Sequence, residues 1–191
     1  MLSEDKFFDK SEKFALYPSV DGKFYTYEEL YNKIKAKQTD KDDKLIILYA
    51  SDKESQHSYI ENAKTKGYEV LLLDSPIVSH LIQKLESSKE KISFARVDSD
   101  HIDSLINKDD SKVSKLNEEE KTNLESVLKE VIPDEKYTIK LESLDGKDDP
   151  FTITTPEFMR RMKEMQQSGG GGMFGAGNMP EMFNLVINTN S

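Results

Sequence analysis

The chain has 191 residues and a formal net charge of −9, with 36% hydrophobic and 33% charged residues. This length suits one medium domain or two small ones, with a lean core beneath a heavily charged surface. The negative charge argues against a chain that mainly holds nucleic acid, and the absence of cysteine excludes disulfides, thiolate metal sites and a cysteine nucleophile.

The sequence shows no signal of export or membrane insertion. The first ten residues, MLSEDKFFDK, do not resemble a signal peptide, and no apolar stretch approaches the length of a membrane span. We therefore expect a cytoplasmic protein whose partners are neither nucleic acid nor membrane.

The segment TYEELYNKIKA, residues 26–36, predicts the first clear helix. Thr26 stands at the N-cap position with Glu29 three residues later, which is the pattern of a capping box. One helical face then collects the apolar side chains Tyr27, Leu30, Tyr31 and Ile34.

Three apolar runs follow, and each predicts a strand. They are LIILYA (45–50), YEVLLL (68–73) and ISFARV (92–97). Helical patterns separate them, so we predict a small three-stranded parallel sheet with flanking helices and right-handed crossovers.

The two intervening helices have their own start and stop signals. The first turns Tyr59, Ile60 and Ala63 inward and ends at Gly67. The second opens with Ser75 as N-cap and Pro76 as first helical residue. Its apolar face consists of Ile77, Val78, Leu81, Ile82 and Leu85.

A polar stretch without periodicity, residues 107–115, predicts a domain boundary. We divide the chain into an α/β domain at 1–110, a linker at 111–116 and a second domain at 117–191. The second domain begins with a capping box at Asn117 and Glu120. A helical stripe follows, made of Leu124, Val127, Leu128 and Val131, and Pro133 ends it.

The remainder predicts a smaller antiparallel α+β domain. YTIKLESL and FTIT alternate as two antiparallel strands joined through the turn-prone DGKDDP, and Thr155-Pro156 opens one more helix. The strand-like FNLVIN (183–188) is followed at once by NTNS. We expect the domain to be truncated there, because a strand needs neighbours to complete its sheet.

Nucleotide binding is the first function to consider for a parallel sheet. Neither GxGxxG nor GxxxxGK[ST] occurs in the chain, and the turn SDKES after the first strand has no glycine to let the backbone approach a pyrophosphate. The sequence therefore predicts no cofactor site in this chain.

Acidic residues at the strand ends support an alternative function. Asp98 and Asp100 follow the third predicted strand as D-x-D, while Asp52 and Asp74 follow the first two. Carboxylates gathered at this edge could hold Mg²⁺ in a metal-dependent phosphoryl-transfer enzyme. The favoured interpretation is that each aspartate caps the following helix.

The three histidines offer no metal site by spacing. His57, His80 and His101 share neither HxH nor HxxxH spacing, and all three stand among surface-type residues. No GxSxG motif accompanies them, so we assign neither metal ligands nor catalytic residues.

Six of the seven methionines lie between Met159 and Met182. Phe158, Met159, Met162 and Met165 share a helical face, and Met173 and Phe174 follow in a glycine-rich segment. Methionine is flexible and polarisable, so such a surface can adapt to unlike apolar partners. For the helix, core packing and partner binding stay equally open; for Met173 and Phe174, partner binding is favoured.

Several of these segments resemble the bacterial ninety-kilodalton heat-shock chaperone family, in collinear order along essentially the whole chain. They are DKFFDKSEKFAL, DGKFYTYEEL, KLIILYASDKESQHSYIENAKTKGYEVLLLDSPIVSHLIQKLE and FMRRMKEM with FNLVINTN. KGYEVLLLDSPIV is the most specific part.

The resemblance implies that residues 1–110 form the small end of the family's middle domain and that its C-terminal domain starts near residue 116. The family couples ATP hydrolysis in an N-terminal domain to clamp closure around client proteins. ATP and Mg²⁺ would then belong to the full-length protein, an ATPase and homodimer, while this chain would lack the nucleotide pocket and the dimerising helices.

The resemblance also implies a client-binding site. The family's client-contacting amphipathic helix matches Phe158, Met159, Met162 and Met165 here, with Met173 and Phe174 in the loop that follows. The four glycines at 169–172 depart from many relatives. The expected function is the binding of unfolded or partly folded proteins, and a structural connector with an ordinary core helix is the plainer possibility.

Overall fold

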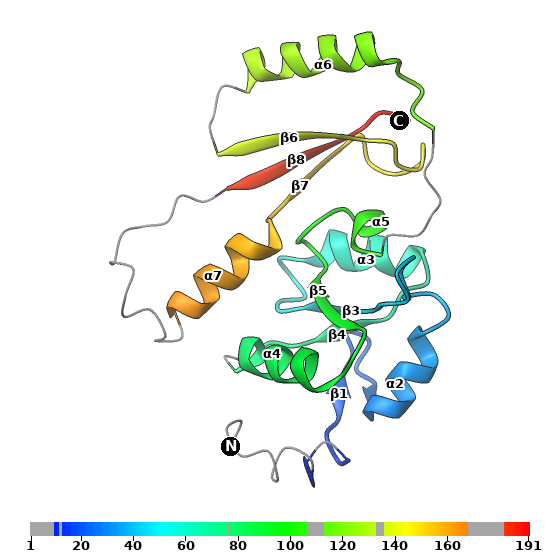
Figure 1. Ribbon diagram of the computed structural model, residues 1–191, viewed down its shortest axis with the longest axis vertical. Coiled ribbons are helices and arrows are strands. Elements are labelled where there is room, and N and C mark those ends of the chain that lie inside the picture. The colour runs from blue at the N-terminus through cyan, green and yellow to red at the C-terminus, as the bar shows by residue number, and fades with distance from the viewer. Residues whose placement is uncertain (1–9, 12, 76, 107–112, 133–135, 168–181) are drawn as a thin grey trace. The chain divides into compact units, whose positions relative to one another are not determined.

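A computed structural model describes residues 10–11, 13–75, 77–106, 113–132, 136–167 and 182–191. The chain forms two compact units (Figure 1). The first comprises residues up to 98 together with 104–107, and the second comprises 99–103 together with the residues from 108 onwards. The domain limits drawn from the sequence stay predictions.

The first unit is built on a parallel sheet of β3 (Leu45–Ala50), β4 (Val70–Leu72) and β5 (Ile92–Arg96), in the order β4-β3-β5. All six residues of the central strand β3 are buried. This explains why LIILYA is continuously apolar: a central strand covered on both faces has no solvent side. The three-stranded parallel sheet expected from the sequence is confirmed.

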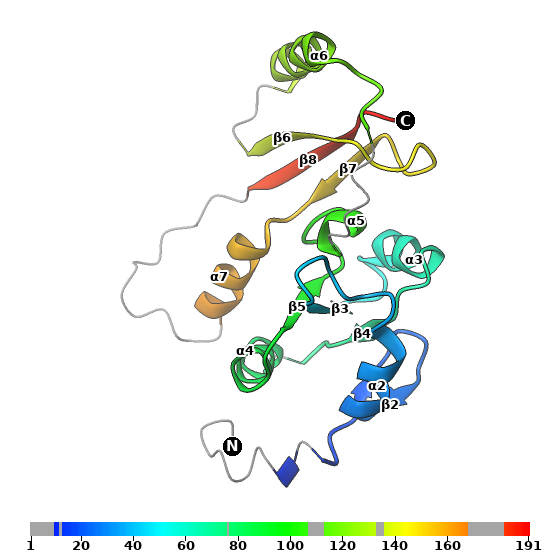
Figure 2. The same ribbon diagram turned by 45° about the vertical axis from the view of Figure 1, so that its right-hand side comes forward.

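Helices α3 (His57–Thr65) and α4 (Val78–Ser88) connect these strands and lie on opposite sides of the sheet (Figure 2). Right-handed crossovers require this arrangement, because the chain moves outward from β3 to β4 and then back across to β5. Gly67, the predicted stop of α3, has a φ of +75°, which glycine adopts without strain.

The predicted start of α4 needs a correction. Ile77, not Ser75, occupies the N-cap position, and the helix begins at Val78, whose N–H donates to the Ser75 carbonyl. Ile77 is exposed instead of facing the core, while Val78, Ile82 and Leu85 are buried as expected. The N-cap residue points away from the helix face that packs on the sheet.

The first unit also contains helix α2 (Tyr27–Ile34) and a short hairpin of β1 (Tyr17–Pro18) and β2 (Phe24–Tyr25). The capping box of Thr26 and Glu29 is present in full. Leu30 and Ile34 join the core, whereas Tyr31 remains exposed. Among the described residues, one cluster of this core is formed by Tyr17, Leu30, Ile34, Leu45, Ile47, Tyr49, Leu71, Leu73, Val78, Ile82, Leu85, Ile92 and Phe94.

The second unit holds a sheet of β6 (Tyr137–Glu142), β7 (Phe151–Thr154) and β8 (Phe183–Asn188) in the order β6-β8-β7. The expected mixed α/β class is confirmed, but β6 and β7 do not pair directly. Strand β8 lies between them, parallel to β6 and antiparallel to β7. Strand β8 is therefore hydrogen-bonded along both of its edges to strands of this chain.

Helix α6 (Glu118–Val131) lies along this sheet (Figure 1) and starts with the predicted capping box of Asn117 and Glu120. Its apolar stripe is less buried than expected, because Val127 and Val131 are exposed. The short helix α5 (Ile102–Leu105) follows β5. In the described part of the chain, no helix is long and apolar enough to cross a membrane.

Candidate functional site

Helix α7 (Glu157–Gln167) carries the methionine- and phenylalanine-rich pattern. It follows β7 through Thr155 and Pro156, and the Pro156 carbonyl accepts a hydrogen bond from the N–H of Arg160. Proline suits this position, since a helix start needs no N–H donor there. The helix that the sequence predicts is therefore present, anchored to the end of an edge strand.

A single carboxylate organises the first turn of α7. Glu157 Oε2 accepts a hydrogen bond from Arg160 Nε at 3.0 Å, and Glu157 Oε1 accepts one from Arg161 Nε at 2.6 Å. Burial raises the pKa of the Glu157 carboxyl, but the hydrogen bonds and positive charges of the two arginines lower it further, so that it lies below its usual value of 4.5. The Glu157 carboxyl is thus kept ionised, and it fixes the positions of both guanidinium groups by hydrogen bonds.

The apolar side of the helix is open to solvent at its start. The Phe158 side chain is 71% exposed, and Met159 and Met162 are half-buried. Arg160, on the opposite side of the helix by its spacing from Phe158, is only 4% exposed. The buried side of this helix turn therefore contains a paired arginine, and Phe158 is not a core residue.

Three of the predicted client-contacting residues cannot be placed in the same way. Met165 belongs to α7, but its side chain lies outside what the structure describes. Met173 and Phe174 fall in 168–181, outside the described residues. The described part of the candidate site, called the client face below, is therefore Phe158, Met159 and Met162.

The acidic strand ends do not assemble into a metal site for phosphoryl transfer. Both oxygens of Asp98 accept hydrogen bonds from Arg96, at 2.6 and 2.9 Å. Asp100 Oδ1 accepts one from the N–H of His101, and Asp100 Oδ2 lies 3.5 Å from Lys140 Nζ. Each carboxylate has a protein partner of its own, so the phosphoryl-transfer alternative is not supported.

In the loop after β3, side chains of the loop itself accept hydrogen bonds from its backbone N–H groups. Asp52 Oδ1 accepts hydrogen bonds from the N–H groups of Glu54 and Ser55, in the turn before α3. The N-cap of α3 is Gln56, without a side-chain cap bond, so the expectation that Asp52 caps this helix was wrong. Gln56 Oε1 accepts from the N–H groups of Ser51 and Asp52, at 2.8 and 3.0 Å. The buried Gln56 had no recognisable sequence signal, since glutamine is usually a surface residue.

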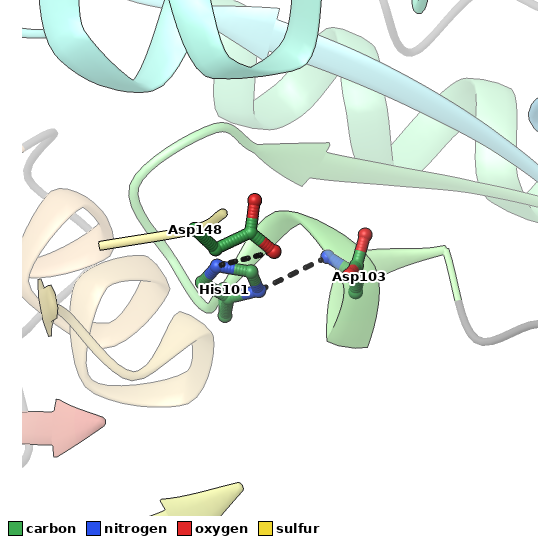
Figure 3. Close-up of side chains that lie close together, drawn as sticks. All are labelled: His101, Asp103 and Asp148. Atoms are coloured by element: carbon green, nitrogen blue, oxygen red, sulfur yellow. Dashed lines mark hydrogen bonds and ion pairs between the residues drawn. The ribbon is translucent and has the colours of Figure 1, made fainter. Parts of the chain in front are cut away.

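The histidines differ from one another more than the sequence suggested. His57 and His80 are exposed as expected. His101 is only 2% exposed, so its prediction as a surface residue was wrong. Its burial depends on residues far along the chain, including Asp148, which lies beside its imidazole ring in Figure 3. Spacing along the sequence could not have revealed this contact.

Comparison with known proteins gives a consistent family. The family model described as Hsp90 protein matches residues 13–171. The chain is 45% identical to the chaperone protein HtpG of Bacteroides fragilis and 44% identical to that of Bacteroides thetaiotaomicron. It is 40% identical to the HtpG of Porphyromonas gingivalis. Each match covers 99% of this chain but only 28% of the relative's own length.

Proposed function

Because the chain belongs to the Hsp90 protein family, we propose that it helps an ATP-dependent molecular chaperone to bind unfolded or partly folded client proteins. The contact is made by the client face on α7, continued by Met165, Met173 and Phe174. The observation that carries the proposal is the exposure of Phe158 on a helix whose opposite side is buried. Phe158 shares a helix face with the half-buried Met159 and Met162, so its exposed ring belongs to an apolar cluster, which supports an interaction surface.

The physical basis is shallow, adaptable apolar contact. Complete burial of a phenylalanine or methionine side chain is worth about 1.5–3 kcal/mol. A few such side chains therefore give weak binding that releases a client again. Methionine can change rotamer to fit different apolar segments, which suits a chaperone that must accept many sequences.

The charges of the chain fit this role. With a net charge of −9, the chain repels other copies of itself, which helps to keep a complex with an aggregation-prone client in solution. Hydrolysis of ATP with Mg²⁺ and homodimerisation are assigned by this proposal to the longer protein. In that protein, nucleotide-driven closure would change the geometry of the client face.

The test is whether the chain suppresses aggregation of a chemically denatured model protein without ATP. Three proteins are compared: wild type, Phe158→Ser, and the matched control Phe24→Ser, which removes a 62% exposed phenylalanine from β2. We expect wild type and Phe24→Ser to suppress aggregation equally and Phe158→Ser to lose most of the effect. Equal suppression by all three, or none by wild type, would reject the client face and leave the chain as a connector.

A further inference from the structure

Three potential metal ligands come together in the second unit, on residues outside α7. His101, Asp103 and Asp148 each offer one ligand atom, and these three atoms lie within 4.8 Å of one another. Figure 3 shows the Asp148 carboxylate beside the imidazole ring, and Asp103 joined to the ring through its backbone N–H. His101 and Asp103 lie at the start of α5, while Asp148 lies in the turn before β7, so the fold joins residues about one quarter of the chain apart.

The imidazole is fixed from several directions. His101 is 2% exposed, and its backbone N–H donates to Asp100 Oδ1 at 2.8 Å. Its Nδ1 accepts a hydrogen bond from the Asp103 N–H at 3.3 Å, and its Nε2 lies 4.0 Å from Asp148 Oδ2. A buried imidazole held in one orientation pays little entropy when it binds a ligand.

The carboxylate of Asp148 is held by the turn that carries it. The N–H of Asp148 donates to the Asp145 carbonyl at 2.9 Å, and Asp148 Oδ2 accepts from the Asp145 N–H at 3.3 Å. Asn188, at the end of β8, donates to the same Asp145 carbonyl at 2.7 Å. The turn is therefore attached to the central strand of the sheet, and Asp148 keeps its position beside His101.

The distances suit an ion better than a direct bond. At 4.0 Å, His101 Nε2 and Asp148 Oδ2 are too far apart for a hydrogen bond. Ligand atoms about 2.0–2.2 Å from a zinc ion lie at most about 4.4 Å from each other. The observed limit of 4.8 Å needs only a small rotation of one side chain to meet this condition.

We propose that His101, Asp103 and Asp148 bind one divalent transition-metal ion, with water completing its coordination. Imidazole and carboxylate ligands without a thiolate favour Zn²⁺ or Mn²⁺ over softer ions. Nε2 gives its lone pair to the ion and the ring proton moves to Nδ1, which gives up the hydrogen bond that it accepts from the Asp103 N–H in the ion-free chain. The ion offsets the charge of the two carboxylates and joins the start of α5 to the turn at 145–148.

The test is titration of the chain with Zn²⁺ by calorimetry and with Co²⁺ by visible absorption, which reports nitrogen and oxygen ligands. Asp103→Asn and Asp148→Asn keep the side-chain shape and remove one charge each. Asp149→Asn, at the exposed neighbour of Asp148, is the matched control. All variants are first shown to be folded by circular dichroism.

We expect wild type and Asp149→Asn to bind one ion, and the other two variants to bind at least tenfold more weakly. Saturation with Zn²⁺ should raise the melting temperature of wild type and of Asp149→Asn only, because a ligand that binds the folded state stabilises it. Absence of binding by wild type, or equal affinity in all four proteins, would overturn the proposal. This inference does not rest on client binding.

Discussion

The carboxylate of Glu157 and the guanidinium of Arg161, one turn apart on α7, are joined by a hydrogen bond of 2.6 Å from Nε to Oε1. The same carboxylate also binds Arg160, which is almost fully buried. Glu157 thereby pairs with two cations at the helix start, where a negative charge is also favoured by the helix dipole. The orientation of the client face depends on this turn, because Phe158 directly follows Glu157.

Replacement of Glu157 by glutamine should loosen the first turns of α7. Glutamine removes the charge that both arginines contact, and charge-assisted hydrogen bonds contribute more than neutral ones. We expect a local loss of about 1–2 kcal/mol, which is roughly a tenfold faster amide hydrogen exchange in α7. Glu118→Gln is the control, since Glu118 also begins a helix and pairs with a lysine but is 90% exposed. Equal acceleration in α6 and α7 would contradict a special role for Glu157.

The same residue should give α7 a dependence on pH. Because its pKa is lowered in the folded state, Glu157 contributes stability above the pKa of the unfolded chain. That contribution is lost as the pH falls through the lower, folded pKa. Hydrogen exchange corrected for its intrinsic pH dependence should therefore show α7 losing protection below about pH 4.5 in wild type but not in Glu157→Gln. Parallel profiles for the two proteins would refute this assignment.

Asn188 should be a major stabilising residue of the second unit. Its Oδ1 accepts hydrogen bonds from the N–H groups of Leu144 and Asn190, and its Nδ2 donates to the Asp145 carbonyl. Asn188→Ala leaves these buried groups without their partner, so we expect a loss of about 2–4 kcal/mol in the free energy of unfolding. Asn123→Ala, on the exposed side of α6, should change it by about 0.5 kcal/mol or less. Exchange of the β8 amides with increasing urea measures both, and similar values would count against the network.

Gln38 should be a major stabilising residue of the first unit. Its Nε2 donates to the Ile46 carbonyl at 2.9 Å and its Oε1 accepts from the Glu69 N–H at 2.7 Å, so one side chain joins the segments entering β3 and β4. Gln38→Leu keeps the size but removes both bonds, and we expect a loss of about 2–3 kcal/mol. Gln83→Leu on the exposed side of α4 is the matched control. Thermal unfolding compares them, and a Gln38→Leu variant as stable as this control would show the bonds to be unimportant.

The sequence predicts the local parts of this fold well. The capping boxes at Thr26 and Asn117 and the strand at 45–50 depend on neighbouring residues, so a short window contains the information. Strand pairing is different, because β8 inserts between β6 and β7 from about thirty residues further along. Nothing in FTIT or YTIKLESL distinguishes a direct hairpin from two strands that share a third.

In the candidate site, too, features set by neighbouring residues can be predicted, and features set by distant contacts cannot. The amphipathic pattern of α7 follows from helical spacing and residue type, whereas the sequence left open whether Phe158 is exposed. The burial of His101 does not, because it arises from contact with a turn 47 residues away in sequence. Gln38 and Gln56 were missed for a related reason: a polar residue becomes a core residue only when distant backbone groups supply its partners.

The most direct test of the central claim is the response of the methionine methyl groups to a bound client. The chain is labelled with ¹³C at its seven methionine methyl groups and titrated with a permanently unfolded model protein, with Met182 ahead of β8 as the reference. The account predicts that the signals of Met159 and Met162 shift or broaden first, and that Phe158→Ser weakens this response. Binding that leaves both signals unchanged would contradict it.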